Sequence, residues 1–339
     1  MQNNPSPSES VKQVIFDRWS FLAEATFEPI AQGSSQATYF VYTPDNRFVL
    51  KLYAATTETA QIQYEHSLLT FLQSTDFSFA IPLPICTTSG ETFIVVEADG
   101  RSLNAALFPR IVGQAMNRQN LNQVQSAGFA LAKLHHQLAK FDPQGKLARL
   151  PFWGALDRIH PQIRNPLTVG QILSLGLEEQ ERFSQLLSEA IEAAPYLYAT
   201  LPIQTIHADY ITPNILVEND RVVGILDFEF ATRDLRLLDY LSSLDQFASF
   251  PWKDDLFEEI VRAFSRGYRA CSYLTVAEMK AAIAVWKLQR ASSIVYWTGR
   301  LLQGKGNRQQ IADAVMETLR FETWLESNQR RLLDALGIA

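Results

Sequence analysis

The chain has 339 residues, of which 47% are hydrophobic, and it carries a formal net charge of −6 with a pI near 5.5. A single hydrophobic core stops growing near roughly 250–300 residues, so this length predicts two lobes. No run of lysine and arginine is long enough to indicate a surface for nucleic acid.

The cysteines and the amino terminus favour a protein of a reducing compartment. Cys86 and Cys271 lie far apart and outside any C-x-x-C spacing, which argues against a disulfide framework or a structural zinc site. The first eight residues are polar and lack the features of a signal peptide. No apolar stretch reaches the roughly 20 residues that a membrane helix requires. We therefore expect a soluble, cytoplasmic protein with no membrane or nucleic-acid partner.

The amino-terminal third predicts a small lobe rich in strands. A helix is expected over 8–21, and the helical spacing of apolar residues predicts another over 57–73. A break at 97–100 favours a hinge, so we place one lobe at 1–97 and the other at 98–339. Four short apolar runs read as strands, at 26–30, 37–43, 47–54 and 92–96.

Two charged residues in this lobe stand where apolar ones are expected. Lys51 interrupts an apolar strand, where a buried ammonium is costly unless it meets a carboxylate or a ligand. Glu65 lies on the apolar face of the helix over 57–73, with Leu68, Leu69 and Leu72 at i+3, i+4 and i+7. The two residues are therefore predicted to form an ion pair.

The rest of the chain predicts a mainly helical lobe. Strands are expected only within 207–230, and 141–169 reads as an irregular segment. His135 falls on the apolar face of a helix and is interpreted as a hydrogen-bonded core histidine. Periodic apolar positions predict helices over 121–139, 178–194, 235–247, 256–273, 276–302 and 310–336.

Within 207–230 lies the pattern that carries most chemical information. The run from His207 to Asn214 places Asp209 and Asn214 five residues apart, and Asp227-Phe228-Glu229 follows thirteen residues later. The apolar runs between the two motifs are separated by Glu218-Asn219-Asp220, which predicts a tight hairpin. A hairpin returns the chain to its start, so Asn214 and Asp227 are predicted to lie side by side and share a divalent ion.

Segment 207–239 resembles the superfamily of aminoglycoside phosphotransferases, choline kinases and type II homoserine kinases, whose fold is that of the protein kinases. The resemblance implies an α+β, bilobal, protein-kinase-like fold with a small antiparallel-sheet lobe and a larger helical lobe. It implies ATP and Mg²⁺ as cofactors, with Asp209 as catalytic base and Asn214 and Asp227 as metal ligands. His207 and Asp239 would support the catalytic loop.

The same resemblance assigns nucleotide contacts in the first lobe. Lys51 and Glu65 would hold the α- and β-phosphates, and Glu97 lies in the segment that would offer backbone groups to adenine. Only one glycine occurs in the loop expected to cover the phosphates, where the candidates are Gly33, Ser34 and Ser35. Glu229 stands where protein kinases have glycine, and whether it serves a metal or a cationic substrate is left open.

Three function classes follow from these motifs. The first is a kinase for a small alcohol, with homoserine ahead of choline, ethanolamine and aminoglycosides; the acidic composition mildly favours cationic acceptors. The second is a protein kinase, disfavoured because the Asp-Phe-Gly and Ala-Pro-Glu sequences are missing. The third is a nucleotide-binding protein of this fold without catalysis. The acceptor, the choice between ATP and GTP, and the oligomeric state are not encoded in any local motif.

Overall fold

A computed structural model describes residues 6–30, 37–98 and 100–337 of the chain. These residues fall into two compact units. The first comprises Met1–Val112, Asp142–Leu147 and Gly224–Glu229, and the second comprises Gly113–Phe141, Ala148–Val223 and Phe230–Ala339. The predicted α+β class is confirmed, since the first unit holds an antiparallel sheet and the second is mainly helical.

The first unit is built on a five-stranded sheet in the order β1-β2-β3-β5-β4. Every neighbouring pair in it is antiparallel. The strands are β1 (Thr26–Pro29), β2 (Ala37–Tyr42), β3 (Arg47–Leu52), β4 (Ile94–Ala98) and β5 (Arg101–Pro109).

Strand β5 was not predicted, and it moves the end of the first unit. Glu97 pairs with Ser102 and Ala98 with Arg101, so the segment expected to be a hinge lies where β4 is followed by its antiparallel partner β5. The unit continues to Val112, past the boundary expected at residue 97. Strand β5 has consecutive buried residues because both of its faces are covered, which removes the polar and apolar alternation that would reveal a strand.

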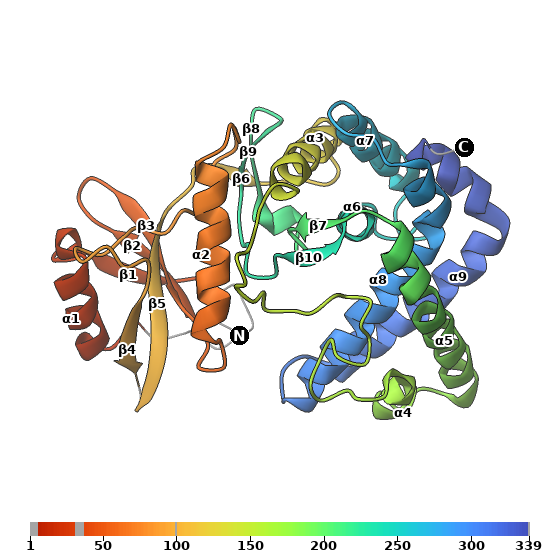
Figure 1. The fold of residues 1–339 in the computed structure, drawn as a ribbon, viewed down its shortest axis with the longest axis horizontal. Helices are drawn as coiled ribbons and strands as arrows, with labels where there is room; N and C mark the ends of the chain where they lie inside the picture. Colours follow the sequence, from red (N-terminus) through yellow and green to blue (C-terminus); the bar gives the residue numbers. More distant parts are fainter. Residues whose placement is uncertain (1–5, 31–36, 99, 338–339) are drawn as a thin grey trace. The chain divides into compact units, whose positions relative to one another are not determined.

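Two helices cover the two faces of this sheet (Figure 1). Helix α1 (Glu9–Arg18), followed by the 3₁₀ turn η1 (Ser20–Leu22), packs on one face against side chains such as Leu50 and Leu107. Helix α2 (Thr59–Gln73) lies at the other face, where Ile62 joins Ala106 and Phe108. Successive residues of a strand point to opposite faces of the sheet, so they pack into the two different hydrophobic cores.

The second unit contains the helices that the apolar periodicity predicted. They are α3 (Leu121–Leu138), α5 (Leu177–Thr200), α6 (Arg236–Ala248), α7 (Phe257–Arg269), α8 (Val276–Leu302) and α9 (Arg308–Leu336), with the short α4 (Val169–Ile172) and the 3₁₀ turns η2 (Pro166–Thr168) and η3 (Thr212–Asn214). Among the residues described, none of the helices combines the length and apolarity needed to cross a bilayer. Helix α5 continues through Pro195, beyond its predicted end at residue 194.

Short strands support the loop that carries the motif. Strands β8 (Ile215–Glu218) and β9 (Arg221–Ile225) are neighbours in a sheet with β6 (Gln114–Ala115), which confirms the predicted hairpin. Asn219 and Asp220 form its turn with φ of 47° and 62°, as a two-residue hairpin turn requires.

A second, unpredicted ladder joins β7 (Ile203–Ile206) to β10 (Thr232–Leu235). The pairing is antiparallel, with Ile206 opposite Thr232. The chain that follows Ile206 and the chain that precedes Thr232 therefore leave the ladder at the same end. This ladder was missed because four-residue strands are too short for a clear period.

Helices α3 and α7 cross closely at two glycines. A side chain at Gly128 would overlap the backbone oxygen of Phe264, and one at Gly267 would overlap the backbone oxygen of Gln125. The close crossing brings His135 of α3 within 2.9 Å of the Tyr268 hydroxyl of α7.

Candidate active site

The first part of the site is an ammonium surrounded by carboxylates in the first unit. Lys51 lies on β3 between Leu50 and Leu52, which point into the core on the α1 side, so its own side chain is on the α2 face of the sheet. Its Nζ lies 3.6 Å from Glu65 Oε1, as predicted. It also lies 3.6 Å from Asp227 Oδ1 and 3.3 Å from Glu229 Oε2.

Burial and the neighbouring carboxylates shift the pKa of Lys51 in opposite directions. Burial disfavours the ammonium, but Glu65, Glu229 and Asp227 together outweigh it and raise the pKa of Lys51 well above its ordinary value. Burial raises the pKa of Glu65 to about 7, although Lys51 opposes that rise. Three carboxylates therefore share the ammonium of Lys51 within the first unit.

A buried hydrogen-bond chain holds Glu65 in place. The Tyr53 hydroxyl lies 3.3 Å from Glu65 Oε2 and 3.2 Å from His66 Nε2, and His66 Nδ1 lies 2.9 Å from Thr92 Oγ1. Burial, together with a smaller effect of the Lys51 charge, lowers the pKa of His66 to about 3, so this ring is neutral at pH 7. Sequence reasoning missed Tyr53 and His66, whose only local signal is a polar group on a buried face.

Asp227 combines an unusual backbone with an unsatisfied oxygen. Its φ is 59°, a left-handed conformation that is uncommon outside glycine and is often found at functional sites. Its Oδ1 is buried and receives no hydrogen bond from any residue that the structure describes. Such an oxygen suits a cation that would supply the missing interaction.

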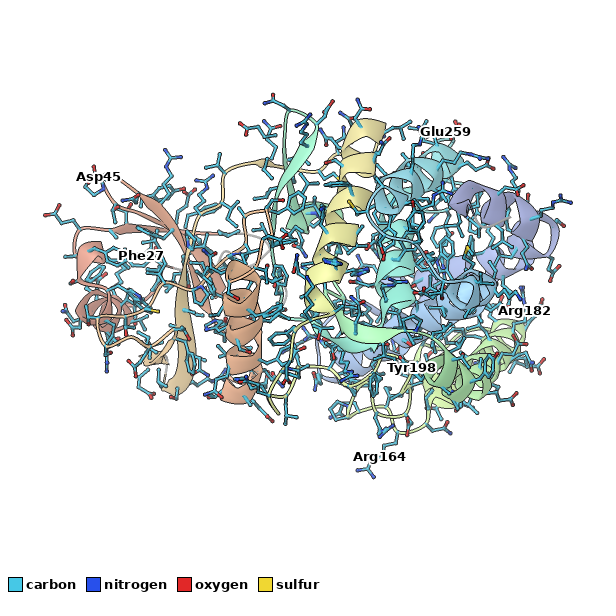
Figure 2. The ribbon with its side chains drawn as sticks, turned by 45° about the horizontal axis from the view of Figure 1, so that its top comes forward. Phe27, Asp45, Arg164, Arg182, Tyr198 and Glu259 are labelled. Atoms are coloured by element: carbon cyan, nitrogen blue, oxygen red, sulfur yellow. The ribbon has the colours of Figure 1, made fainter. Side chains whose placement is uncertain are left out.

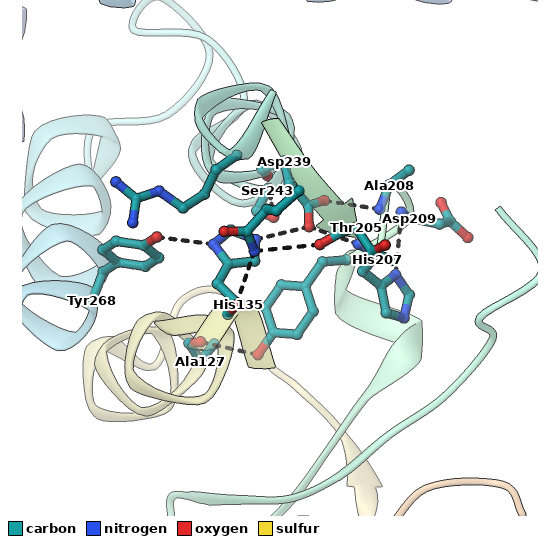
Figure 3. Close-up of polar contacts among 12 residues, drawn as sticks. Ala127, His135, Thr205, His207, Ala208, Asp209, Asp239, Ser243 and Tyr268 are labelled. Carbon is teal, nitrogen blue, oxygen red and sulfur yellow. Dashed lines mark hydrogen bonds and ion pairs between the residues drawn. The ribbon is translucent and has the colours of Figure 1, made fainter. Parts of the chain in front are cut away.

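The second part of the site is the loop that follows β7 in the second unit (Figure 3). Asp239, fully buried on α6, accepts hydrogen bonds from the backbone N–H of His207 and of Ala208, each at 2.9 Å. Ala208 has a φ of 62°, which costs energy for a residue with a side chain, and the hydrogen bond that its N–H donates to Asp239 stabilises this conformation. The loop therefore presents Asp209 in a fixed conformation.

His135 completes this support. Its Nε2 lies 3.0 Å from Asp239 Oδ2 and its Nδ1 lies 2.9 Å from the Tyr268 hydroxyl (Figure 3). Burial alone would raise the pKa of Asp239, but the hydrogen bond and charge of His135 and the bond from the backbone of His207 lower it below its usual value. The interpretation of His135 as a hydrogen-bonded core residue is confirmed, and its partner proves to be Asp239.

Asp209 and Asn214 lie together. The Asn214 Nδ2 group donates to Asp209 Oδ2 at 2.8 Å and to the Asp209 carbonyl oxygen at 3.0 Å. Both bonds use the amide nitrogen, so the carboxamide oxygen of Asn214 is the atom that could coordinate a cation. His207 Nδ1 accepts a hydrogen bond of 3.2 Å from the Asp209 backbone N–H, so His207 shapes the loop.

Some predicted site residues are not tested by these contacts. Gly33, Ser34 and Ser35 lie outside the described residues. Glu97 is exposed on β4, and its backbone pairs with Ser102. The predicted pairing of Asn214 with Asp227 stays a prediction, since the two residues belong to different units.

The comparisons with known proteins agree with this geometry. The model of a family described as "Phosphotransferase enzyme family" matches residues 26–274. A homoserine kinase of Methylobacillus glycogenes is 26% identical over 284 residues, covering 80% of this chain and 78% of its own.

Two solved structures share the fold. A microcompartment-associated aminopropanol kinase has a TM-score of 0.66 at 16% identity, covering 97% of this chain and 100% of its own. An amicoumacin kinase in complex with AMP-PNP, Ca²⁺ and Ami has a TM-score of 0.67 at 15% identity, covering 91% of this chain and 93% of its own.

Proposed function

This chain belongs to the phosphotransferase enzyme family and is a small-molecule kinase, and we propose that it transfers the γ-phosphate of ATP to the hydroxyl of a small alcohol, with homoserine as the leading acceptor. The Lys51 cluster carries the proposal. Three carboxylates lie within 3.6 Å of its ammonium, and one of their oxygens, Asp227 Oδ1, is buried and receives no hydrogen bond in the part of the chain that the structure describes, so it suits a cation. A magnesium nucleotide brings that cation together with phosphates for the lysine.

We assign the divalent cation to Asp227 and Asn214. Asp227 Oδ1, which is buried and receives no hydrogen bond from the described residues, and the carboxamide oxygen of Asn214 are hard oxygen ligands of the kind that magnesium prefers. In the described residues no group of three or more His, Cys, Asp and Glu could hold a metal ion. Magnesium commonly completes its shell with water and substrate phosphates. When bound, it would neutralise charge on the transferring phosphoryl group.

Lys51 is assigned to the α- and β-phosphates, with Glu65 holding the ammonium in position. Their separation of 3.6 Å and the burial of Glu65 fix the ammonium on the α2 face of the sheet. Glu229 lies 3.3 Å from the same ammonium, so we place it beside the phosphates as a second carboxylate for the cation or a contact for a cationic substrate group. Gly33, Ser34, Ser35 and the backbone at Glu97 remain our candidates for covering the phosphates and contacting adenine.

Asp209 is proposed as the catalytic base. Its carboxylate would accept a hydrogen bond from the acceptor hydroxyl and take that proton as the oxygen attacks the γ-phosphorus. The attack forms the new O–P bond while the bond to the β-phosphate oxygen breaks and ADP leaves. Asn214 and the loop held by Asp239 orient Asp209, so the hydroxyl meets a carboxylate that is already in place.

The acceptor assignment is supported by the homoserine kinases among the relatives, such as the one that matches 80% of this chain. A screen of the purified protein with Mg-ATP tests it. The acceptors are homoserine, choline, ethanolamine, sugars and aminoglycosides, and Asp209→Ala is the blank. Phosphorylation of homoserine above that blank supports the proposal. A strong signal with another acceptor reassigns the substrate, and binding of Mg-ATP without transfer to any acceptor identifies a nucleotide-binding protein.

A further inference from the structure

Three polar side chains of the first unit, Tyr53, His66 and Thr92, have no part in the chemistry above. Resting on the proposed kinase activity, we propose that they form a one-way hydrogen-bond chain that positions the Lys51–Glu65 pair for the phosphates of the nucleotide. Tyr53 is the positioning residue of this chain, and His66 takes part as the neutral tautomer that carries its proton on Nε2.

The polar atoms of Tyr53 and His66 lie within an apolar core. Tyr53 is 1% exposed and packs with Ile62, Ala106 and Phe108. The His66 ring is 3% exposed and meets Phe108 edge to face at 5.8 Å. Packing in this core needs only the rings, whereas burying a hydroxyl or an imidazole costs free energy unless the group is hydrogen-bonded. The hydroxyl and the ring nitrogens therefore need a reason beyond packing.

Tyr53 contacts both members of the ion pair. Its hydroxyl lies 3.3 Å from Glu65 Oε2, while Lys51 Nζ lies 3.6 Å from the other carboxylate oxygen, Oε1. Lys51 Nζ also lies 5.1 Å from the centre of the Tyr53 ring, a distance at which an aromatic ring attracts a cation. The phenol thus holds the carboxylate at one oxygen, and the ammonium holds it at the other.

The sheet sets the place of the Tyr53 ring. Residues 51 and 53 are two apart along the chain, so their side chains lie on the same face of the sheet. The Tyr53 N–H donates to the Asn104 carbonyl oxygen at 2.9 Å, which extends the β3–β5 ladder by one residue beyond Leu52. A lysine ammonium ends a flexible four-carbon chain. The ring, held by the sheet, therefore provides a rigid support for the ammonium of Lys51.

Counting the protons gives the direction of the chain at its Glu65 end. Burial, followed by the charge of Glu65, raises the pKa of Tyr53 well above its ordinary value, so the phenol keeps its single proton. An ionised Glu65 only accepts hydrogen bonds, so the Tyr53 hydroxyl donates to it. The phenol oxygen lies 3.2 Å from His66 Nε2 and must then accept a hydrogen bond from that nitrogen.

The same count fixes the other end of the chain. The pKa of His66 is about 3, so its ring is neutral and has one N–H, which lies on Nε2. Nδ1 is then an acceptor, and it lies 2.9 Å from Thr92 Oγ1, whose hydroxyl donates. Each group donates once, and every donor points toward Glu65. The opposite direction would turn the lone pairs of the phenol oxygen toward a carboxylate.

A purely structural interpretation explains these hydrogen bonds but not the group at which they end. A buried polar network can satisfy its own members, and the loss of one member then costs stability. This chain ends on Glu65, whose other oxygen lies 3.6 Å from the ammonium assigned to the phosphates. Losing the phenol hydroxyl should therefore change nucleotide affinity as well as stability, and the two effects can be measured separately.

Calorimetric titration with Mg-ADP at pH 8, above the pKa of about 7 of Glu65, tests the positioning role. Tyr53→Phe keeps the ring and removes only the hydroxyl. Its Kd for Mg-ADP should rise by on the order of 3–30-fold, as expected for a lost hydrogen bond to a charged group. The Kd for adenosine, which has no phosphate for Lys51, should stay as in the wild type. The ratio of the two Kd values separates positioning from a general loss of structure.

Tyr198→Phe is the matched control. Tyr198 lies on α5 and is labelled in Figure 2, and its hydroxyl also donates to a carboxylate, that of Asp234, at 2.5 Å. Because Tyr198 belongs to the second unit, Tyr198→Phe should lower Tm but leave the Kd for Mg-ADP as in the wild type. An unchanged Kd in Tyr53→Phe, or an equal rise of Kd in the two variants, would overturn the positioning role.

Nitrogen NMR of the five histidines tests the direction of the chain. The signals of His66 are those missing from His66→Gln, and a protonated ring nitrogen is distinguished from an unprotonated one by its chemical shift. We expect Nε2 to be protonated in the wild type at pH 8. Thr92→Val removes the donor to Nδ1 and should raise the Kd for Mg-ADP, by less than Tyr53→Phe does. A wild-type His66 protonated at Nδ1 would overturn the one-way chain.

These measurements need no acceptor, which separates this proposal from the proposed function. Weaker Mg-ADP binding by Tyr53→Phe supports the positioning role even when no acceptor is phosphorylated, a result that would refute only the transfer. A wild type that binds Mg-ADP no more tightly than Tyr53→Phe would refute only the positioning role. A wild type that binds no magnesium nucleotide would refute both.

Discussion

Replacing Asp239 by asparagine should lower both the free energy of unfolding of the second unit and the kcat of the protein. The buried carboxylate accepts hydrogen bonds from the backbone N–H of His207 and Ala208 at 2.9 Å and lies 3.0 Å from His135 Nε2. An asparagine keeps one acceptor oxygen and turns an NH₂ group toward a backbone N–H, which leaves two donors opposed. Because the pKa of Asp239 is lowered despite its burial, its interactions outweigh the cost of burying the charge.

The size of the effect follows from these contacts. Hydrogen bonds to charged groups contribute about 1.5–3 kcal/mol each, and a buried donor left unsatisfied costs about 1–3 kcal/mol. We expect Asp239→Asn to lower the free energy of unfolding by about 3–5 kcal/mol. For a unit of this size, about 2–4 °C of Tm corresponds to each kcal/mol, so Tm should fall by roughly 6–20 °C. Calorimetry measures this shift.

Asp245→Asn is the matched control for the Asp239 variant. Asp245 is a partly buried carboxylate on the same helix, but its partners are Arg290 and Trp286 rather than the loop. Both variants should lose stability, whereas only Asp239→Asn should lower kcat in the acceptor assay at a temperature where both are folded. A Tm within about 2 °C of wild type, or an equal loss of kcat in the two variants, would refute the role of Asp239.

Three further predictions concern the proposed nucleotide and catalytic groups. Asp209→Ala should lower kcat by on the order of 10²–10⁴ with Mg-ATP affinity nearly unchanged in a thermal-shift titration; normal turnover would exclude it as base. Lys51→Met should destabilise the first unit by about 3–5 kcal/mol because it removes the cation beside the buried Glu65, and it should weaken Mg-ATP binding; a wild-type hydrogen-exchange pattern in α2 would contradict this. Burial raises the pKa of Glu65 from 4.5 to about 7. The folded state therefore binds the Glu65 proton more tightly than the unfolded state does. As the pH rises from 4.5 to above 7, the free energy of unfolding of the wild type should fall relative to that of Glu65→Gln, by at most about 3 kcal/mol. Exchange rates of α2 amides at several pH values measure it, and a pH-independent difference would contradict the raised pKa.

Features that depend on neighbours along the chain were predictable from the sequence. The ion pair of Lys51 with Glu65 followed from two charges at apolar positions of a strand and a helix, and the structure confirms it. The β8–β9 hairpin followed from two apolar runs around Asn219 and Asp220. Such patterns are local because one turn of helix or one tight turn is set by residues a few positions apart.

Features that depend on contacts between distant segments were predicted wrongly or not at all. Strand β5 was read as the start of the helical lobe, because its two covered faces leave no alternation for a sequence window to detect. The β7–β10 ladder joins residues almost thirty positions apart through strands of four residues. In both cases, the residues of one strand do not show which distant strand it pairs with.

By itself, the sequence determined the reaction class of this protein, since the residue types and spacing of the segment from His207 to Asp239 are those of a phosphotransferase. Only the tertiary structure decided which groups surround these residues: it places Glu229 beside Lys51, and Asp239 under the catalytic loop. The physical reason is that electrostatic interactions depend on distance and burial. Net charge sums over the whole chain, whereas a bound acceptor experiences only the side chains that the fold brings to it.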